Sequence, residues 1–497
     1  MNKKEQWGTK LGLVLAMSGN AIGLGNFLRF PVQAIQNGGG AFMIPYFICF
    51  LLMGIPLLWV EWSMGKLGSK NGKHSLPFIL QLLSNKIWIK YLGVFSLFTN
   101  IVVAAYYTYI ESWTLAYLYF SLTQKFVGQN LQQVQYYFET FRTWYHYEGL
   151  IFWLITCFIN VYILSKGIEK GIETAAKWLM PMLLIFAVSL AIFALTLQKG
   201  DYGAVASGLV GFDYLWTPDF SGIWKPKVWL AAAGQIFFTL ALGMGTIQCY
   251  ASYMKKNDEV ALGAMASGWL NEFVEIVLGA SIIIPICVGF MGLDKINEWV
   301  QLGGMGLSFK ILPYLFSQWG IILGTLFGTF WFGALFFAGI TSSLSMGLPL
   351  TSFMNDHFGW SVKKGAWLFG SLIFILGIPC IISPIIFDEF DFWAGSFSLV
   401  LFAVIEIILF SWVWGIDNAW NEINENAKIR IPQIFKFILH KITPVFLILV
   451  LIANIPDLIT KLLQETNLEI ITARMMMISI FFIALLAIHQ SNQYHEN

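Results

Sequence analysis

The sequence predicts an all-α membrane protein of twelve transmembrane helices, with two inverted five-helix repeats in which helices 1 and 6 are discontinuous. Three observations support this prediction. Of the 497 residues, 57% are hydrophobic and only 11% are charged, whereas a soluble domain carries about 25% charged residues. Twelve apolar stretches are long enough to cross a bilayer core of ~30 Å. Glycines interrupt the first and the sixth of these stretches.

The apolar stretches follow one another along the whole chain, separated by polar residues, glycines and prolines. The third is longer than one span requires, which indicates a tilted or protruding helix. We expect a single domain over residues 1–497, with repeat one at about 10–196 and repeat two at about 226–414. Helices 11 and 12, at about 434–488, would serve packing or dimerisation. The twelve stretches lie near residues 10–36, 40–66, 87–123, 147–165, 172–196, 226–253, 261–291, 321–355, 365–382, 386–414, 434–463 and 470–488.

Glycine-rich segments break the apolar pattern of the first and sixth stretches. The first contains SGNAIGLGN at residues 18–26, and the sixth contains TLALGMG at residues 239–245. Unwound backbone at membrane depth is tolerated only where it lines a cavity or is buried in protein, because unpaired amides are costly in lipid. Breaks at matching positions of two repeats are typical of the substrate site of a transporter. The sequence therefore predicts a transport site at these two breaks.

Positively charged residues are distributed unequally between the two sides of the predicted membrane protein. Nineteen Lys and Arg residues fall on the side of the N-terminus and nine on the opposite side. Cytoplasmic loops carry the excess of such residues. Both termini are therefore predicted to be cytoplasmic, in a multi-pass protein of the cell's inner (plasma) membrane.

Several function classes lack their signatures in this sequence. The five cysteines lie singly and far apart, which argues against a disulfide framework, a zinc site or a redox motif. The chain has neither the G-x-S-x-G pattern of many hydrolases nor the phosphate loop of ATP-driven pumps. A net charge of +1 offers no basic surface for nucleic acid. We therefore expect no enzyme and no nucleic-acid partner, and transport energy drawn from an ion gradient.

A few ionisable residues fall inside the apolar stretches. Arg29 lies in FLRFP of the first stretch and requires a counterion or a water-filled vestibule there. Asp391, at the outer end of the tenth stretch, is the candidate partner, either as a gate that opens and closes or as a static buried pair. Glu61, Glu111 and Glu406 are interpreted as structural residues that hold helices together.

Oxygen-bearing side chains gather in the eighth stretch and near the first break. Residues 341–343 read Thr-Ser-Ser, and hydroxyls in a membrane helix usually bond back to the carbonyl four residues earlier. Next to an unwound segment, however, hydroxyls and freed carbonyls suit a hard cation such as Na⁺, which prefers oxygen ligands. Asn20, Asn26 and Asn271 supply side-chain oxygens of the same kind.

Eight motifs along nearly the whole chain carry a resemblance to a known family. They are, in order, GNAIGLGNFLRFPVQAIQNGGGAFMIPYF, GIPLLWVEWSMG, YYTYIESW, GQIFFTLALGMG, YASY, LNEFVEI, FAGITSS and DEFDFWAG. Together they closely resemble the neurotransmitter:sodium symporter family, in particular the bacterial leucine transporter LeuT. The resemblance implies a sodium-coupled symporter that imports a neutral amino acid by alternating access.

The resemblance implies two sodium sites. The first would use the Ala21 carbonyl with side-chain oxygens of Asn26, Thr239 and Asn271. The second would use the carbonyls of Gly19, Ile22 and Ala338 with the hydroxyls of Thr341 and Ser342.

The resemblance also implies a substrate pocket and two gates. The substrate carboxylate would meet the amides of Leu24 and Gly25 at a helix N-terminus, which favours an anion. The implied substrate residues are Asn20, Ala21, Leu24, Gly25, Val103, Tyr107, Phe238, Thr239, Met244, Ser342 and Met346. The outer gate would comprise Arg29 and Asp391, covered by Tyr107 and Phe238, and the inner gate Lys4 and Asp356, near Trp7, Ser252 and Tyr253.

Two positions refine the implied mechanism. Monoamine transporters of the family carry Asp where this chain has Gly23, so here the substrate must supply the carboxylate that completes the first sodium site. Binding of ion and amino acid would then be mutually dependent. Chloride-dependent relatives carry Ser where this chain has Glu275. Transport is therefore expected to be independent of chloride, with proton counter-movement if Glu275 titrates.

Departures from the leucine transporter pattern bear on specificity. Met244 and Met346 replace Phe and Ile, and Ala241 replaces Ser. Methionines make an adaptable wall, so we expect a neutral, hydrophobic substrate with a preference for larger side chains such as Met, Phe, Tyr or Trp. Lys4 replaces Arg, which removes bidentate geometry and weakens the inner gate.

Two alternative functions stay open. One is a proton-coupled carrier or exchanger on the same fold. The other is an amino-acid-binding membrane sensor, for which the short tails leave little room for an output domain. The expected partners are the amino acid, membrane lipid and, further, a second copy of the chain in a homodimer.

Overall fold

The computed structural model describes residues 5–84, 86–464 and 467–490, and all regular secondary structure in these ranges is helical. Among the described residues, ten helices are long and apolar enough to cross a membrane. The number is eleven if the bent pair formed by residues 10–21 and 24–36 is one span. The prediction of an all-helical, multi-pass membrane protein is confirmed. The count of twelve spans and the layout of the two repeats stay predictions.

Several of the long helices continue through a π-helical segment without a break. α4 (Gly40–Cys49) runs in this way into α5 (Ile55–Lys70), α14 (Ala261–Glu272) into α15 (Ala280–Met291), and α21 (Pro384–Phe390) into α22 (Ser398–Ile408). The other long helices contain α7 (Val94–Leu122), α9 (Tyr147–Leu164), α10 (Thr174–Thr196), α19 (Ile321–Phe358), α20 (Val362–Ile382), α24 to α26 (Ile434–Phe437, Thr443–Ala453 and Ile455–Leu463) and α27 (Leu468–Gln490).

The first predicted break is present. α1 (Lys10–Ala21) ends where Ile22 and Gly23 adopt extended conformations, and α2 (Leu24–Leu28) and α3 (Phe30–Gln36) follow. The two parts are bent by 51° relative to each other. The predicted segment 18–26 therefore contains a true interruption of the helix.

The second predicted break is also present. α12 (Pro226–Thr239) and α13 (Thr246–Ala251) are separated by residues 240–245. Ala241, Gly243 and Gly245 have positive φ angles of 52°, 73° and 78°. Glycine adopts such angles without steric cost, whereas Ala241 is strained there by its Cβ. Each of the two helices is too short to count as a span.

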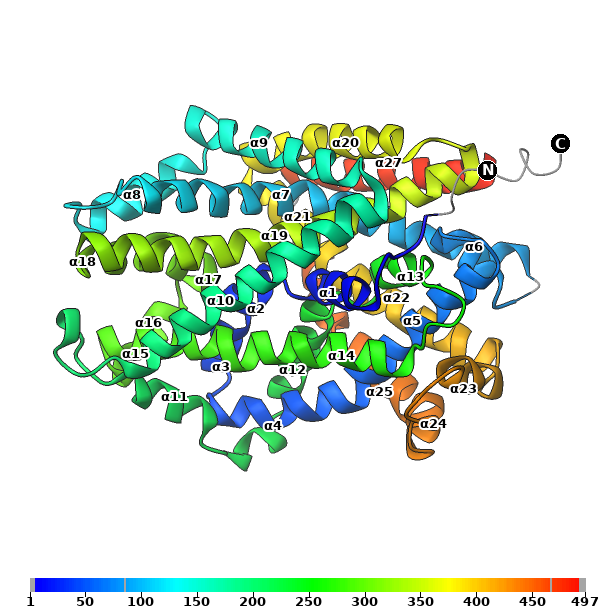
Figure 1. Cartoon of the computed structure of the whole chain (residues 1–497), viewed down its shortest axis with the longest axis horizontal. Coiled ribbons are helices and arrows are strands. Elements are labelled where there is room, and N and C mark those ends of the chain that lie inside the picture. The colour runs from blue at the N-terminus through cyan, green and yellow to red at the C-terminus, as the bar shows by residue number, and fades with distance from the viewer. Residues whose placement is uncertain (1–4, 85, 465–466, 491–497) are drawn as a thin grey trace.

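Both breaks lie near the centre of the molecule. In the view of Figure 1, α1 and α13 are central, with α7 and α20 on one side and α4 and α14 on the other. α1 packs against α10, α14 and α19, and α13 packs against α5 and α19. Every residue of α2 and α13 is buried. The unwound segments are therefore enclosed by protein, as membrane depth requires.

Short helices occupy the connections between the long ones. They are α6 (Leu76–Gln81), α8 (Leu131–Phe141), α11 (Gly208–Trp216), α16 (Ile296–Val300), α17 (Gly303–Gly306), α18 (Leu312–Gln318) and α23 (Ile416–Asn424).

Candidate substrate and ion sites

A buried cavity lies where the two helix breaks meet α7 and α19. All residues predicted to bind the substrate line this cavity: Asn20, Ala21, Leu24, Gly25, Val103, Tyr107, Phe238, Thr239, Met244, Ser342 and Met346. The remaining lining residues are Gly23, Asn26, Tyr106, Ala241, Gly395 and Leu399.

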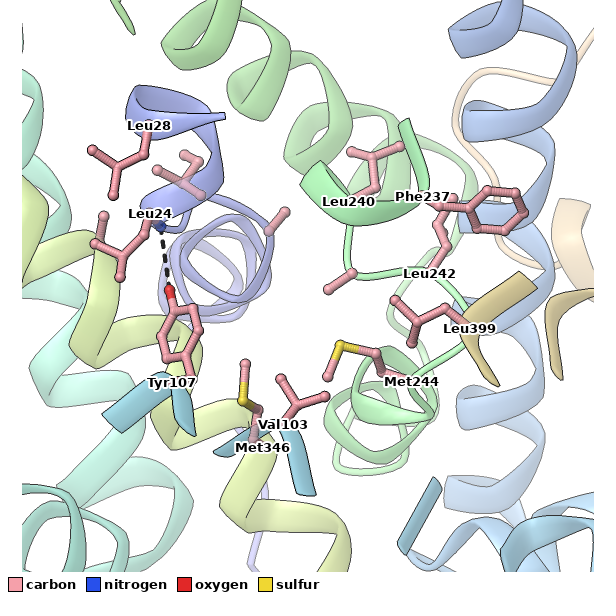
Figure 2. Close-up of a cluster of buried hydrophobic side chains, with 14 of the residues drawn as sticks. Leu24, Leu28, Val103, Tyr107, Phe237, Leu240, Leu242, Met244, Met346 and Leu399 are labelled. Carbon is pink, nitrogen blue, oxygen red and sulfur yellow. Dashed lines mark hydrogen bonds between the residues drawn. The ribbon is translucent and has the colours of Figure 1, made fainter. Parts of the chain in front are cut away.

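The N-terminus of α2 forms the polar end of the cavity. The backbone N–H of Leu24 donates to the Tyr107 hydroxyl at 3.2 Å, the bond drawn in Figure 2. The backbone N–H of Gly23 donates to the side-chain oxygen of Asn26 at 2.8 Å. N–H groups at a helix N-terminus carry partial positive charge. This end of the cavity is therefore suited to a carboxylate.

The other end of the cavity is apolar. Figure 2 shows Val103 and Met346 together near Tyr107, with Met244 and Leu399 opposite them. None of the lining residues, all of which are described, carries a charge. The two flexible thioether side chains make this wall adaptable. A neutral, apolar group fits this end.

Two glycines of the first break allow close approach of neighbouring side chains. A Cβ at Gly23 would lie 2.9 Å from the Ser342 hydroxyl oxygen and 3.0 Å from the Tyr107 hydroxyl oxygen. A Cβ at Gly25 would overlap with the ring of Phe238. Any larger residue at these positions would therefore displace the cavity wall or the Phe238 ring.

The first predicted ion site is a buried cluster of side-chain polar groups. The Asn26 amide nitrogen donates to Asn271 Oδ1 at 2.9 Å, to Glu275 Oε2 at 3.0 Å and to Thr239 Oγ1 at 3.2 Å. Thr239 also contacts Glu275 directly. Ala21, whose carbonyl is predicted to join this site, lines the same cavity as Asn26. We call these five residues the first oxygen cluster: Ala21, Asn26, Thr239, Asn271 and Glu275.

Further polar residues extend this cluster away from the cavity. Gln235 donates to Glu275 Oε1 at 2.9 Å, and the Tyr46 hydroxyl lies 3.0 Å from the same oxygen. The Tyr46 hydroxyl also donates to Glu272 Oε2 at 2.8 Å. Sequence reasoning missed Tyr46, Gln235 and Glu272, although each of them stands in one of the quoted motifs.

The second predicted ion site combines backbone carbonyls with hydroxyls. Ser342 Oγ lies 3.2 Å from the Gly19 carbonyl oxygen and 3.4 Å from that of Ile22. Thr341 Oγ1 donates to the Ala338 carbonyl at 3.1 Å and to the Phe337 carbonyl at 2.9 Å, so its back-bonding to the helix is present as well. The second oxygen cluster is defined by Gly19, Ile22, Ala338, Thr341 and Ser342.

The donor chemistry of both clusters fits a hard cation. Within the described residues, no group of three or more His, Cys, Asp or Glu side chains is placed to hold a metal ion. The two clusters instead offer amide, hydroxyl and carbonyl oxygens, with one carboxylate at the first. Hard cations are bound by such oxygens.

The predicted outer gate residues lie around a second cavity of about 250 Å³. Tyr107 and Phe238 line both this cavity and the candidate substrate cavity, so they form part of the partition between the two cavities. The Arg29 guanidinium lies over the Phe238 ring, 4.4 Å from its centre, and Asp391 accepts a 2.7 Å hydrogen bond from Tyr106. Among the described residues, Arg29 forms no ion pair within 4.0 Å.

Hydrogen bonds hold the described residues of the predicted inner gate. The Trp7 indole donates to the Tyr250 carbonyl at 2.9 Å, and the Trp7 backbone N–H donates to the Tyr253 carbonyl at 3.3 Å. Asp356 Oδ2 accepts the backbone N–H groups of His74 and Ser75, each at 2.7 Å. Lys4, the predicted partner of Asp356, lies outside the described residues.

Comparison with known proteins identifies the family. Two overlapping matches to the Sodium:neurotransmitter symporter family cover residues 4–143 and 132–494. The chain belongs to this family. Its members are sodium-dependent transporters and not enzymes.

Relatives of this symporter come from distant organisms. An uncharacterized sodium-dependent transporter of Methanocaldococcus jannaschii is 32% identical over 92% of each chain. Sodium-dependent nutrient amino acid transporter 1 of Drosophila melanogaster is 24% identical over 90% of this chain and 77% of its own. The crystal structure of MhsT in complex with L-phenylalanine matches with a TM-score of 0.77 and 30% identity, covering 90% of this chain and 99% of MhsT.

The candidate substrate cavity also contains residues that the motifs did not assign. Tyr106 and Gly395 line the cavity from the YYTYIESW and DEFDFWAG motifs, so the motifs themselves could have indicated them. Leu399 lies outside every quoted motif. Only the packing of the π-helical segment Asp391–Phe397 and of α22 against α7 brings it to the cavity.

Proposed function

We propose that this symporter imports a neutral, hydrophobic amino acid together with sodium, by alternating access. One observation carries the proposal: a single uncharged cavity joins a helix N-terminus, an apolar wall and an oxygen cluster. A zwitterionic amino acid with an apolar side chain matches these features one by one. The family relationship supports sodium as the coupling ion.

The substrate carboxylate would take a position at the N-terminus of α2, near Leu24, Gly25 and the Tyr107 hydroxyl. Asn26 and Thr239 line the same cavity and belong to the first oxygen cluster. The carboxylate can therefore reach both the helix end and an ion held by that cluster. With Gly23 in place of an acidic residue, the substrate supplies this charge, so binding of amino acid and sodium becomes mutually dependent.

Two sodium ions are proposed, one at each oxygen cluster. The first would be held by Ala21, Asn26, Thr239 and Asn271, and the second by Gly19, Ile22, Ala338, Thr341 and Ser342. Sodium at the second cluster would connect the unwound end of α1 to α19, because its ligands come from both helices. The two ions would thus stabilise the arrangement of the same helix break from two sides.

Specificity for larger apolar side chains is proposed for the Val103, Met244, Met346 and Leu399 end of the cavity. The side chains of this wall are adaptable and uncharged. MhsT, the structural relative, was crystallised with L-phenylalanine, which supports an aromatic or large aliphatic substrate. Acidic and basic amino acids would bury an unpaired charge here and are disfavoured.

Chloride independence is proposed from Glu275. Its carboxylate contacts Asn26 and Thr239 within the first oxygen cluster and, when ionised, would supply a negative charge beside the ion. We expect uptake to persist when chloride is replaced by gluconate. A Glu275→Ser variant should instead require chloride for full uptake. A large loss of wild-type uptake in gluconate would contradict the assignment.

Transport would proceed by alternating exposure of the cavity through the outer and inner gates. We propose a single domain of twelve spans, in two inverted repeats followed by two helices, with both termini cytoplasmic in the plasma membrane. α12 and α13 together would form the sixth span, in the manner of α1 to α3. Membrane lipid would cover the exposed apolar side chains of helices such as α27.

The decisive experiment is uptake of a panel of labelled amino acids into proteoliposomes with an imposed sodium gradient. We expect accumulation of neutral hydrophobic amino acids, and none when K⁺ replaces Na⁺. Accumulation that follows a proton gradient without sodium would indicate a proton-coupled carrier. Sodium-dependent binding without any accumulation would indicate an amino-acid sensor.

A further inference from the structure

A buried carboxylate joins the start of α1 to the start of α10. Glu173 is the last residue of a π-helical turn, Ile168–Glu173, that precedes α10, and its side chain is fully buried. Its Oε2 accepts the backbone N–H of Gly8 at 2.6 Å. Its Oε1 accepts the backbone N–H of Thr9 at 3.0 Å and the Thr9 hydroxyl at 2.9 Å. One side chain thus makes three hydrogen bonds to a segment far away in sequence.

The same carboxylate contributes to the N-terminal cap of α1. Thr9 is the N-cap residue, and its hydroxyl accepts the backbone N–H of Gly12 at 3.0 Å while it donates to Glu173. A Cβ at Gly12 would overlap with the Glu173 carboxylate, so the acid lies directly against the helix backbone. A negative charge at a helix N-terminus is stabilising. Removal of Glu173 should therefore weaken both the cap and the attachment of α1.

The segment that Glu173 holds is continuous with the inner gate. Gly8 and Thr9 directly follow Trp7, whose buried indole donates to the Tyr250 carbonyl. Lys255 adds an exposed hydrogen bond to the Gly8 carbonyl at 2.9 Å. Trp7 cannot leave Tyr250 by a large movement while the next two residues stay bonded to Glu173.

Glu173 has a second partner on its own helix. Lys177 Nζ lies 2.6 Å from Glu173 Oε1, and the Lys177 side chain is 38% exposed. A buried carboxylate without any partner would be costly. If the start of α1 moves away, Lys177 stays beside Glu173 and keeps the charge paired. The contact between α1 and α10 can therefore open without leaving an isolated charge.

The two helices also meet at the second oxygen cluster. A Cβ at Gly19 would lie 3.3 Å from Met180 Sδ, seven residues after Glu173 on the α10 side. Gly19 is one of the proposed sodium ligands. A movement that separates α1 from α10 would therefore also disturb this cluster.

We propose that Glu173 is a positioning residue for the inner gate: it holds the start of α1 on α10 and releases it when sodium and substrate leave on the cytoplasmic side. The inference rests on the proposed alternating-access function. It assigns to the carboxylate directly before α10 a role that is separate from the predicted Lys4, Asp356, Trp7 and Tyr253 gate.

The test uses Cys249 as a reporter of inner-gate opening. Cys249 is buried next to Tyr250, with its sulfur 3.2 Å from the Ser352 hydroxyl oxygen. The full chain would be prepared with the other cysteines, Cys49, Cys157, Cys287 and Cys380, changed to Ala. The labelling rate of Cys249 by a charged methanethiosulfonate is then measured in sodium buffer.

Glu173→Ala is expected to raise the labelling rate about tenfold, within the usual range of coupling between a contact and a conformational equilibrium. Thr9→Val removes one of the three hydrogen bonds and should give an increase of about threefold. Because both changes disrupt one contact, the double variant should label no faster than Glu173→Ala alone. Glu173→Gln retains an oxygen acceptor and should fall between wild type and Glu173→Ala.

Glu469→Ala is the matched control. It removes the same charge from an exposed side chain in the first turn of α27, and should leave the labelling rate unchanged. An unchanged rate in Glu173→Ala, or an equal increase in Glu469→Ala, overturns the proposal. Should Glu173→Ala fail to fold, additive effects of Thr9→Val and Glu173→Gln would overturn it too.

Labelling does not require turnover, so the two proposals fail separately. Faster labelling of Glu173→Ala in a protein that accumulates no amino acid would support the role of Glu173 and refute symport. Sodium-driven uptake combined with unchanged labelling of Glu173→Ala would refute the role of Glu173 alone.

Discussion

The two proposed gates of the central cavity are built from different parts of the chain. At the outer gate, the side chains of Tyr107 and Phe238 separate the substrate cavity from a second cavity, and Asp391 is bonded to Tyr106. At the inner gate, a backbone segment that includes Trp7 is held by hydrogen bonds from several helices. The outer gate is a partition of side chains, whereas the inner gate is a bound piece of main chain.

This difference bears on how each gate opens. Opening of the proposed outer gate would require the rings of Tyr107 and Phe238 to move. Opening of the proposed inner gate would require several hydrogen bonds to a backbone segment to break together, and collective movement of a helix end takes microseconds to milliseconds. The two proposed gates would therefore open by different structural changes.

The largest effect is expected from Asn26→Ala, which removes the centre that both gates enclose. The Asn26 amide contacts Gly23, Thr239, Asn271 and Glu275. Since each buried partner left unsatisfied costs about 1–3 kcal/mol, binding of sodium and of amino acid should weaken together by at least about 100-fold. Equilibrium binding of a labelled substrate over a range of sodium concentrations measures this effect.

Asn71→Ala, at an exposed asparagine, is the control for Asn26→Ala and should bind normally. Loss of substrate binding with unchanged sodium affinity would show that the first oxygen cluster is not an ion site.

Trp7→Ala breaks the inner gate and is the next largest change. Trp7 is only 1% exposed, and truncation of a buried Trp costs about 3–5 kcal/mol. Here the truncation would destabilise the state in which the inner gate is closed. We expect faster labelling of Cys249 and at least about tenfold weaker substrate binding. Trp224→Ala, at a tryptophan that is 85% exposed, should change neither. Normal labelling in Trp7→Ala would contradict the assignment of this gate.

Phe238→Ala opens the outer gate without touching the inner one. The ring lies against Gly25 and under Arg29, so its removal joins the two cavities that it separates. Substrate should dissociate about tenfold faster, as loss of ~1.4 kcal/mol of contact implies, while Cys249 labelling stays at the wild-type rate. Stopped-flow dissociation measures the rate, and an unchanged rate would exclude Phe238 as a lid.

Asp391→Asn is expected to have the smallest effect. The amide oxygen of Asn can still accept the hydrogen bond from Tyr106, and only the charge that faces Arg29 is lost. The maximal uptake rate should fall by about threefold, since weakly coupled charges contribute less than ~1 kcal/mol, with sodium binding unaffected. An equal loss of sodium binding would place Asp391 at the ion site and not at the gate.

Both helix breaks could be predicted from local sequence. Three glycines and two asparagines within residues 18–26, and the ALGMG run before α13, stand out against an apolar background. These segments are informative because lipid cannot form hydrogen bonds with unpaired backbone groups. An interrupted span therefore predicts that the unwound backbone lines a cavity or is buried in protein. The motifs further predicted the residues that line the cavity, and the structure brings these together.

The partners of individual polar groups could not be predicted in this way. Asp356 accepts backbone N–H groups at the start of α6, and Arg29 lies over Phe238. Glu272 and Tyr46 adjoin the first oxygen cluster without any sign in their spacing. Each pairing depends on the distance and angle between helices that are remote in the sequence.

The sequence by itself determined that this chain is a helical membrane protein with two unwound segments, because composition and local glycine content decide which stretches can lie in lipid. Only the tertiary structure decided that Glu173 meets Thr9 and that the two gates differ in construction. A contact between residues more than 160 positions apart is set by helix packing, and helix packing is a property of the assembled bundle.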